Sequence, residues 1–542
     1  MKRISILIIL TFPLLGFTQT QQQPKLVIGI VVDQMRYDYL VRFWDRFGEG
    51  GFKKLINEGF NCKNANYNYM PTYTGPGHAS IYSGTTPENH GIIANDWYDK
   101  TTGKVIYCVK DTTVNTIGTK SKNGQMSPNN LLSTTITDQL KLATNFKGKV
   151  IGASIKDRGA ILPAGHKADA AYWFDGEKNG QWVSSSFYMN ELPVWLKKLN
   201  KKNPAKQYLM QPWNTLYPIE TYVESINDNN PYEGTFKMEQ TPTFPHNLPA
   251  LTDSNENYSL IKATPFGNTI LKDLALEIIK EEKLGQDEYT DFFALSFSST
   301  DYVGHQYGPM SIEIEDTYLR LDKDLAELLS YLDQNFKKED VLIFLTADHG
   351  VSNVPQYLVD NKLPGGYFNM AALDSTLKLF LKEQYNADTL ISNVSNYQVF
   401  LNHKYIEDNN WNIQLIENTV AQFLLKQKGI AKVITGSALR NTEFTDRILA
   451  NAQRGYNQVR SGDVLFVLES GWISSEKKTG TTHGSPYTYD THVPLLWYGA
   501  GIKNGATDRS IIIPDIAVTV AMLLNIQPPS ACTGTPIHDL LK

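Results

Sequence analysis

Short apolar runs recur along the chain and constrain its fold more than any other feature. Five of them are bounded by turn residues, at residues 26–32, 150–155, 292–297, 341–345 and 493–497. Runs of this length are typical of strands that are buried on both faces of a parallel sheet. Segments with helical periodicity separate them, such as the apolar stripe of Ile314, Tyr318, Leu321, Leu325, Leu328 and Leu332. The alternation predicts an α/β fold, with a doubly wound, mostly parallel sheet flanked by helices.

The 542 residues leave room for insertions in such a fold. Two regions break the alternation: residues 170–255 are rich in Trp, Tyr, Asn and Pro, and residues 365–480 mix Asn-rich segments with helices. We interpret both as insertions or caps on one catalytic domain that spans residues 20–542. Aromatic side chains in the first region fit either a substrate entrance or the packed core of a cap. They are Trp173, Phe174 and Trp182.

Charge and cysteine content exclude two classes of protein. The net charge is −5 and no basic block is present, whereas a nucleic-acid scaffold needs clustered Lys and Arg to bind phosphates. Three cysteines allow at most one intrachain disulfide, so the chain is not a disulfide-stabilised scaffold. Cys62 and Cys108 are the candidate pair.

The N-terminus has the pattern of an export signal. Lys2 and Arg3 precede a nearly unbroken apolar run at residues 4–17, and polar residues follow it. This layout predicts a cleavable signal peptide at residues 1–19. No other stretch approaches the ~18 apolar residues that a membrane span requires, so we expect no stable span. The sequence therefore predicts a periplasmic or secreted protein.

Acidic residues and histidines cluster where the apolar runs end. In open α/β sheets, ligands bind outside the carboxyl ends of the strands, so these side chains are expected to share one crevice. Carboxylate and imidazole groups together suit Zn²⁺. A single Asp at a strand end is usually a structural residue, but the repeated pattern favours a metal site. The candidate ligands are Asp33, Asp301, His305, Asp348, His349 and His483.

A second candidate feature lies in residues 69–95. The sequence Gly75-Pro76-Gly77 is expected to interrupt regular secondary structure, just before an expected helix start at residues 78–83. Thr74 directly precedes this interruption. A hydroxyl at a helix N-terminus lies where backbone N–H groups favour anions. Beside a metal, this hydroxyl would become a nucleophile. The alternatives are that Thr74 only caps the helix, or that Thr72 is the nucleophile.

These motifs resemble a known family. The chain contains VVDQMR, PTYTGPGHASIYSGTTPENHGIIAN, STDYVGHQYGP, TADHG and TTHGSPY, in that order. The combination resembles the alkaline phosphatase superfamily, in its type I phosphodiesterase and nucleotide pyrophosphatase branch. Within that branch it is most similar to the monoesterases called phosphate-irrepressible alkaline phosphatases. The motifs run from Asp33 to His483 and cover nearly the whole mature chain.

The resemblance implies two Zn²⁺ ions and a covalent phosphothreonine at Thr74. One zinc would be held by Asp301, His305 and His483. The other would be held by Asp33, Asp348, His349 and the Thr74 oxygen. Two metals of this kind bind the attacking and leaving oxygens of an in-line displacement.

Three further residues bear on the substrate. Asn95 matches the family asparagine that donates to a phosphate oxygen, and Lys156 and Arg158 follow the run at 150–155. A phosphate monoester has three non-bridging oxygens that carry two charges, so extra Lys and Arg donors favour it over a diester. We expect Lys156 and Arg158 to contact the phosphate from the side opposite the metals. The predicted activity is hydrolysis of small phosphate monoesters.

Several alternatives remain open. A phosphodiesterase, a nucleotide pyrophosphatase or a phosphonate hydrolase would use the same scaffold. A binding protein that lost its chemistry is disfavoured because all the ligands are present. An isomerase similar to phosphoglycerate mutase is disfavoured because those enzymes use Ser and lack an export signal. Further histidines either orient the ligands or are structural: His78, His90 and His492.

Overall fold

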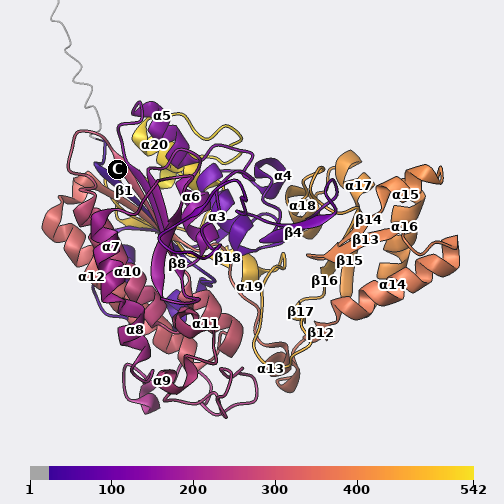
Figure 1. Cartoon of the computed structure of the whole chain (residues 1–542), viewed down its shortest axis with the longest axis horizontal. Coiled ribbons are helices and arrows are strands. Elements are labelled where there is room, and N and C mark those ends of the chain that lie inside the picture. The colour runs from indigo at the N-terminus through magenta and orange to yellow at the C-terminus, as the bar shows by residue number, and fades with distance from the viewer. Residues whose placement is uncertain (1–22, 542) are drawn as a thin grey trace, which may run out of the picture.

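The computed structural model describes residues 23–541, and the predicted signal at residues 1–19 lies outside that range (Figure 1). Its main element is a ten-stranded sheet in which five central strands are parallel. The strand order is β20 (Gly505–Thr507), β2 (Phe60–Cys62), β19 (Leu495–Gly499), β11 (Val341–Thr346), β1 (Leu26–Val32), β10 (Asp291–Phe297), β7 (Val150–Ser154), β8 (Ala170–Asp175), β9 (Gln181–Ser185) and β6 (Thr116–Ile117). The predicted α/β fold is therefore confirmed.

The first four predicted apolar runs correspond to β1, β7, β10 and β11, and every residue of these four strands is buried. The fifth run differs. It divides into β18 (His492–Val493) and β19, and β19 runs antiparallel to β11. Pro494 separates the two strands, because a proline offers no N–H to a sheet ladder.

Helices cover both faces of the sheet. Figure 1 shows α10 (Phe266–Glu281) and α12 (Ile312–Asn335) on one side of it. On the other side lie α3 (Thr74–Ser83), α5 (Ile136–Ala143), α6 (Asp157–Ala164) and α20 (Asp515–Leu524). The predicted apolar stripe lies on α12, and its leucines are buried in the main core. The parallel strands are thus enclosed by helices, and their carboxyl ends lie together at one edge of the layer, where α/β proteins bind ligands.

A second, smaller lobe projects from the sheet (Figure 1). It holds a four-stranded antiparallel sheet and its own hydrophobic core, and α14 (Met370–Tyr385) and α16 (Ile413–Leu424) pack on it. The strand order is β13 (Ile391–Ser395), β14 (Gln398–Leu401), β16 (Val464–Leu468) and β15 (Ile430–Thr435). These elements fall within residues 365–480.

The region at residues 170–255 begins with β8 and β9, which extend the main sheet. Trp173, Phe174 and Trp182 are buried there. The division of the chain into a core and two insertions stays a prediction. All three cysteines are unpaired, so the candidate disulfide between Cys62 and Cys108 is not formed. Within residues 23–541, no helix is long and apolar enough to cross a membrane.

Candidate active site

Three carboxylates meet at one edge of the main sheet. Strand β1 lies between β10 and β11, and all three run parallel. Asp33 directly follows β1, Asp301 lies in the first turn of α11 (Ser299–Tyr307) after β10, and Asp348 lies two residues after β11. All three side chains are buried. The parallel register of the strands is what brings these residues, hundreds of positions apart in sequence, into one place.

The ligand atoms form two overlapping groups. In one, atoms of Asp33, Asp348 and His349 lie within 4.8 Å of one another; in the other, atoms of Asp301, His349 and His483 do. His349 belongs to both groups, and its ring stacks on that of His483, with centroids 3.5 Å apart. His305 was expected in the second group; its Nε2 lies 3.1 Å from Asp301 Oδ1. All six predicted ligands therefore converge.

The three histidines present the same nitrogen to the site. In each ring, Nδ1 donates to a backbone carbonyl, which leaves Nε2 directed toward the carboxylates. This arrangement fixes the tautomer and orientation that a metal ligand requires. The bonds run from His305 to Thr481 O (2.8 Å), from His349 to Gly350 O (2.9 Å) and from His483 to Thr72 O (2.7 Å).

The donor set fits a divalent metal. Asp33 Oδ1 and Asp348 Oδ2 have no hydrogen-bond partner among the described residues, although both side chains are fully buried. Burial, and then the neighbouring Asp33 carboxylate, raise the pKa of Asp348. Burial lowers the pKa of His349 to about 3, so its imidazole is neutral. Buried carboxylates beside neutral imidazoles are compensated by a cation, and this set of oxygen and nitrogen donors is typical of Zn²⁺.

Thr74 lies at the edge of this cluster. It is the first residue of α3, and its Oγ1 is 3.4 Å from His349 Nε2. The helix thus begins four residues before the expected start. Pro76 is tolerated because first-turn N–H groups have no intrahelical partner. A Cβ at Gly77 would collide with Asp348, so glycine lets α3 approach the metal ligands.

The competing hydroxyl, that of Thr72, forms its hydrogen bond away from the metal ligands. Thr72 Oγ1 donates to Ser485 O at 3.0 Å, and the Thr72 carbonyl accepts the bond from His483. Asn95 lies beside the first turn of α3, where its Oδ1 accepts a 2.8 Å bond from Gly75 N. Of the two threonines, Thr74 is the one whose hydroxyl faces the metal ligands.

Lys156 occupies a different place from the one expected. It caps α6, and its Nζ lies 2.7 Å from Asp33 Oδ2 and 2.5 Å from Asp301 Oδ2. Burial lowers its pKa, but the two carboxylates outweigh that effect and raise it. Lys156 therefore bridges carboxylates of the two ligand groups instead of facing them from the opposite side. Arg158 is placed differently: its Nη1 donates to Tyr107 OH at 3.0 Å.

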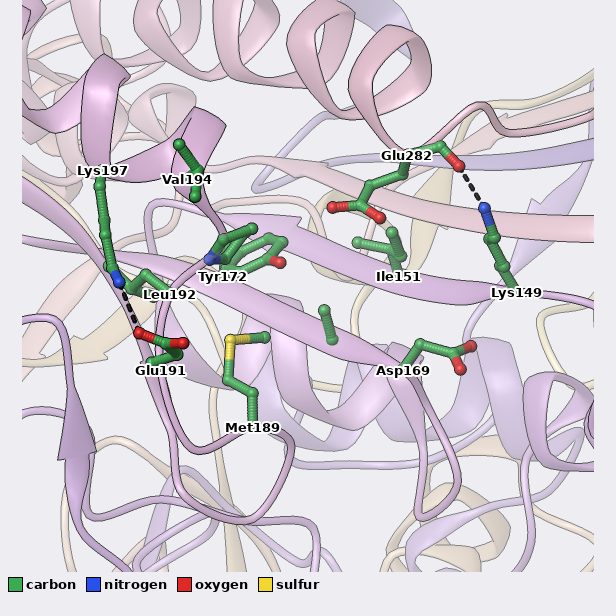
Figure 2. Close-up of a pocket in the computed structure, with 12 residues that line it drawn as sticks. Lys149, Ile151, Asp169, Tyr172, Met189, Glu191, Leu192, Val194, Lys197 and Glu282 are labelled. Carbon is green, nitrogen blue, oxygen red and sulfur yellow. Dashed lines mark hydrogen bonds and ion pairs between the residues drawn. The ribbon is translucent and has the colours of Figure 1, made fainter.

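A polar cavity of about 250 Å³ adjoins this lysine and arginine. Trp173 and Phe174 line it together with Tyr302, so these buried aromatics serve both as packing and as the cavity wall. A larger pocket lies at the amino ends of β7 and β8, the opposite edge of the sheet (Figure 2). Its lysines already have partners: Lys149 donates to the backbone carbonyl of Glu282, and Lys197 pairs with Glu191.

Sequence reasoning missed several residues of the site. Gln34 and Tyr302 each directly follow a predicted aspartate ligand, and that adjacency was the available signal. Gln34 Nε2 donates to Asp301 Oδ1, and the Tyr302 ring lies 5.0 Å from Lys156 Nζ. Of the three histidines left open, only His78 contacts the site: its Nδ1 donates to Thr74 O at 2.9 Å. His90 and His492 bond to Ser80 and to Lys63 O.

Comparison with known proteins places this site among phosphoryl-group hydrolases. Residues 27–492 match the family described as type I phosphodiesterase / nucleotide pyrophosphatase. A protein of Myroides odoratus named calcium-transporting ATPase is 48% identical, over 96% of this chain and 95% of its own. Alkaline phosphatase PhoV of Synechococcus elongatus is 47% identical, over 97% and 94%.

A solved structure is also similar. Alkaline phosphatase PafA of Elizabethkingia meningoseptica is 43% identical, over 97% of this chain and 96% of that protein. The crystal structure of PafA superposes with a TM-score of 0.93 and covers 96% of this chain and 99% of that one. The similarity therefore spans the main sheet and the smaller lobe alike.

Proposed function

Because the chain belongs to the type I phosphodiesterase / nucleotide pyrophosphatase family, we propose that it is an alkaline phosphatase, a hydrolase that releases inorganic phosphate from phosphate monoesters. The relatives named PhoV and PafA support this assignment. One observation carries it: the Thr74 hydroxyl lies beside two converging groups of metal ligands, with Lys156 and Arg158 close by.

We assign two zinc ions to the two ligand groups. Asp33, Asp348 and His349 would hold one ion beside Thr74. Asp301, His305 and His483 would hold the other. When bound, the ions supply Lewis-acid stabilisation of charge on the attacking and leaving oxygens.

Thr74 is the nucleophile in this proposal. The Thr74 hydroxyl gives up its proton, a bond forms between Thr74 Oγ1 and phosphorus, and the bond from phosphorus to the leaving oxygen breaks. The leaving oxygen takes up a proton, so the products are phosphothreonine and an alcohol. Water then loses a proton and attacks phosphorus, the bond from phosphorus to Thr74 Oγ1 breaks, and reprotonation of Oγ1 restores the threonine as inorganic phosphate leaves. The N–H groups of the first turn of α3 favour the anion at this position. Asn95, fixed by its bond to Gly75 N, lies close enough to that turn to donate its amide to a non-bridging oxygen.

Lys156 and Arg158 provide the preference for a monoester. Lys156 bridges Asp33 and Asp301 and places a cation between the two ligand groups. The Arg158 guanidinium is held by Tyr107, so its position is defined before substrate binds. The terminal phosphoryl group of ATP also has three non-bridging oxygens. Lys156 and Arg158 would therefore suit that group as well, which agrees with the word ATPase in the name of the Myroides relative.

Replacement of Arg158 by alanine tests this preference. We expect phenyl phosphate hydrolysis to slow by about 10- to 100-fold, the value of one charged hydrogen bond, and methyl phenyl phosphate hydrolysis to change little. Steady-state kcat/KM on both substrates measures the difference. In the unaltered protein the monoester should be the faster substrate. A faster diester would instead favour the phosphodiesterase alternative, and equal losses in the variant would remove the dianion argument.

The cellular location is part of the proposal. The Lys2-Arg3 pair, the apolar run at residues 4–17 and the polar residues after it support export through a signal peptide. We place the enzyme in the periplasm or outside the cell, where it would release phosphate from small phosphoesters.

A further inference from the structure

Gln34 is held in an unusual backbone conformation at the centre of the site. It directly follows Asp33, it is 1% exposed, and its φ is 63°. This left-handed region is unfavourable for residues other than Gly, Asn and Asp. Such a conformation persists where the surrounding structure enforces it, and residues of this kind concentrate at functional sites.

Gln34 connects the carboxylates that follow three neighbouring strands. Its backbone N–H donates to Asp348 Oδ1 at 3.1 Å, and its side-chain Nε2 donates to Asp301 Oδ1 at 2.7 Å. Its own neighbour is Asp33. The left-handed turn at Gln34 is what directs both donors of one residue toward two different carboxylates. One residue, through its backbone N–H and its side-chain amide, thus contacts both ligand groups without adding charge to a site that already holds three carboxylates.

Gly304 makes room for the Gln34 amide. It lies three residues after Asp301 on α11, so the two residues share a face of the helix. A Cβ at position 304 would collide with Gln34 Oε1. Glycine inside a helix is unfavourable relative to alanine, and the close approach of this amide explains its presence here. Gln34 Oε1 accepts no hydrogen bond from the described residues, so only the donor end of the amide is used.

We propose that Gln34 and Gly304 form a positioning pair that fixes the Asp301 carboxylate relative to Asp348 and so sets the spacing of the two metal sites. The inference rests on the two-zinc function proposed above. Outer-shell hydrogen bonds of this kind orient a metal ligand and contribute to metal affinity. Gln34 acts through the aspartates and not on the substrate.

Zinc affinity measured by chelator competition on the full-length mature protein tests the pair. We expect Q34M, which keeps the length of the side chain but loses the donor, to bind one of the two zinc ions about 10- to 100-fold more weakly. G304A should give the same loss, because its methyl group displaces the amide. Q139M is the matched control: the Gln139 amide donates to Thr134 Oγ1 outside the site. It should retain both affinities.

The double variant Q34A/G304A separates positioning from simple damage to the helix. Alanine at position 34 removes the oxygen that the new methyl group would meet, so G304A should add no further loss of zinc affinity in the Q34A background. An additional loss, or a double variant that fails to fold where Q34A folds, would overturn the pairing. Q34M with unchanged affinity at both sites would overturn the role of Gln34. Fewer than two zinc ions in the unaltered protein would instead contradict the proposed function itself.

Discussion

Replacement of Thr74 by valine should reduce phosphate monoester hydrolysis by at least about 10⁴-fold, the scale on which hydrolases lose rate when their nucleophile is removed. Valine keeps the shape of threonine and loses only the hydroxyl. Thr74 is 1% exposed, and within residues 23–541 the hydrogen-bond contact of its Oγ1 is the long one of 3.4 Å to His349 Nε2. Folding should therefore survive the change, and Asp33, Asp348 and His349 would remain to hold the zinc beside it. Single-turnover kinetics with zinc-loaded protein measure the loss.

Thr72→Val is the matched control. The Thr72 hydroxyl donates to Ser485 O, whereas the bond from His483 goes to the Thr72 backbone carbonyl, which valine keeps. Loss of one such hydrogen bond should slow the reaction by no more than about tenfold. If T72V were inactive and T74V active, the nucleophile would be Thr72. Thr74→Ser should retain activity, because it keeps an oxygen at the same position.

Replacement of His349 by alanine should have the second-largest effect. His349 belongs to both ligand groups, and its ring stacks on His483, so its loss disturbs both metal sites at once. We expect H349A to retain fewer than two zinc ions after dialysis and to lose more than about 100-fold in rate, since even the loss of an outer-shell partner costs 10- to 100-fold. Metal analysis of the dialysed protein measures the zinc content.

His492→Gln provides the control for the loss of a histidine. The His492 ring stacks on Tyr37 and its Nε2 bonds to Lys63 O, away from the ligand groups. This variant should keep two zinc ions and the rate of the unaltered protein. The ligand assignment would be contradicted if H349A also kept both ions and its rate.

Most of the candidate metal ligands could be predicted from sequence because they follow apolar runs; His483 instead lies in a glycine-rich loop. Asp33, Asp301 and Asp348 come at or just beyond the ends of apolar runs, and parallel strands end at one edge of a sheet. Thr74 could be predicted because it precedes a break before a helix. These inferences use local sequence and one general property of α/β sheets, so they do not depend on the order of the strands.

The position of Lys156 depends on strand order and could not be predicted. Strand β7 lies next to β10, so Lys156, two residues beyond β7, reaches Asp301 and, one strand further, Asp33. No local pattern in the sequence encodes that neighbour. The antiparallel direction of β19 also depends on pairing between distant segments.

Gln34 shows a different limit. A glutamine after a strand gives no indication of a left-handed conformation. Gly304, taken alone, indicates only a residue that is unfavourable inside a helix. Only the approach of the Gln34 amide to α11 connects the two residues. Pairs of this kind are visible once the backbone positions are known.

Acid quenching during turnover, followed by mass spectrometry, tests phosphoryl transfer to Thr74 most directly. Zinc-loaded protein is mixed with saturating phenyl phosphate below the pH of its maximal rate, quenched and digested. We expect one phosphoryl group on the peptide that carries Thr74, with fragmentation placing it on that residue, and none in the T74V variant. A phosphoryl group on Thr72 or on another residue, or a Thr74 peptide that stays unmodified while phosphate is released, would contradict the proposed mechanism.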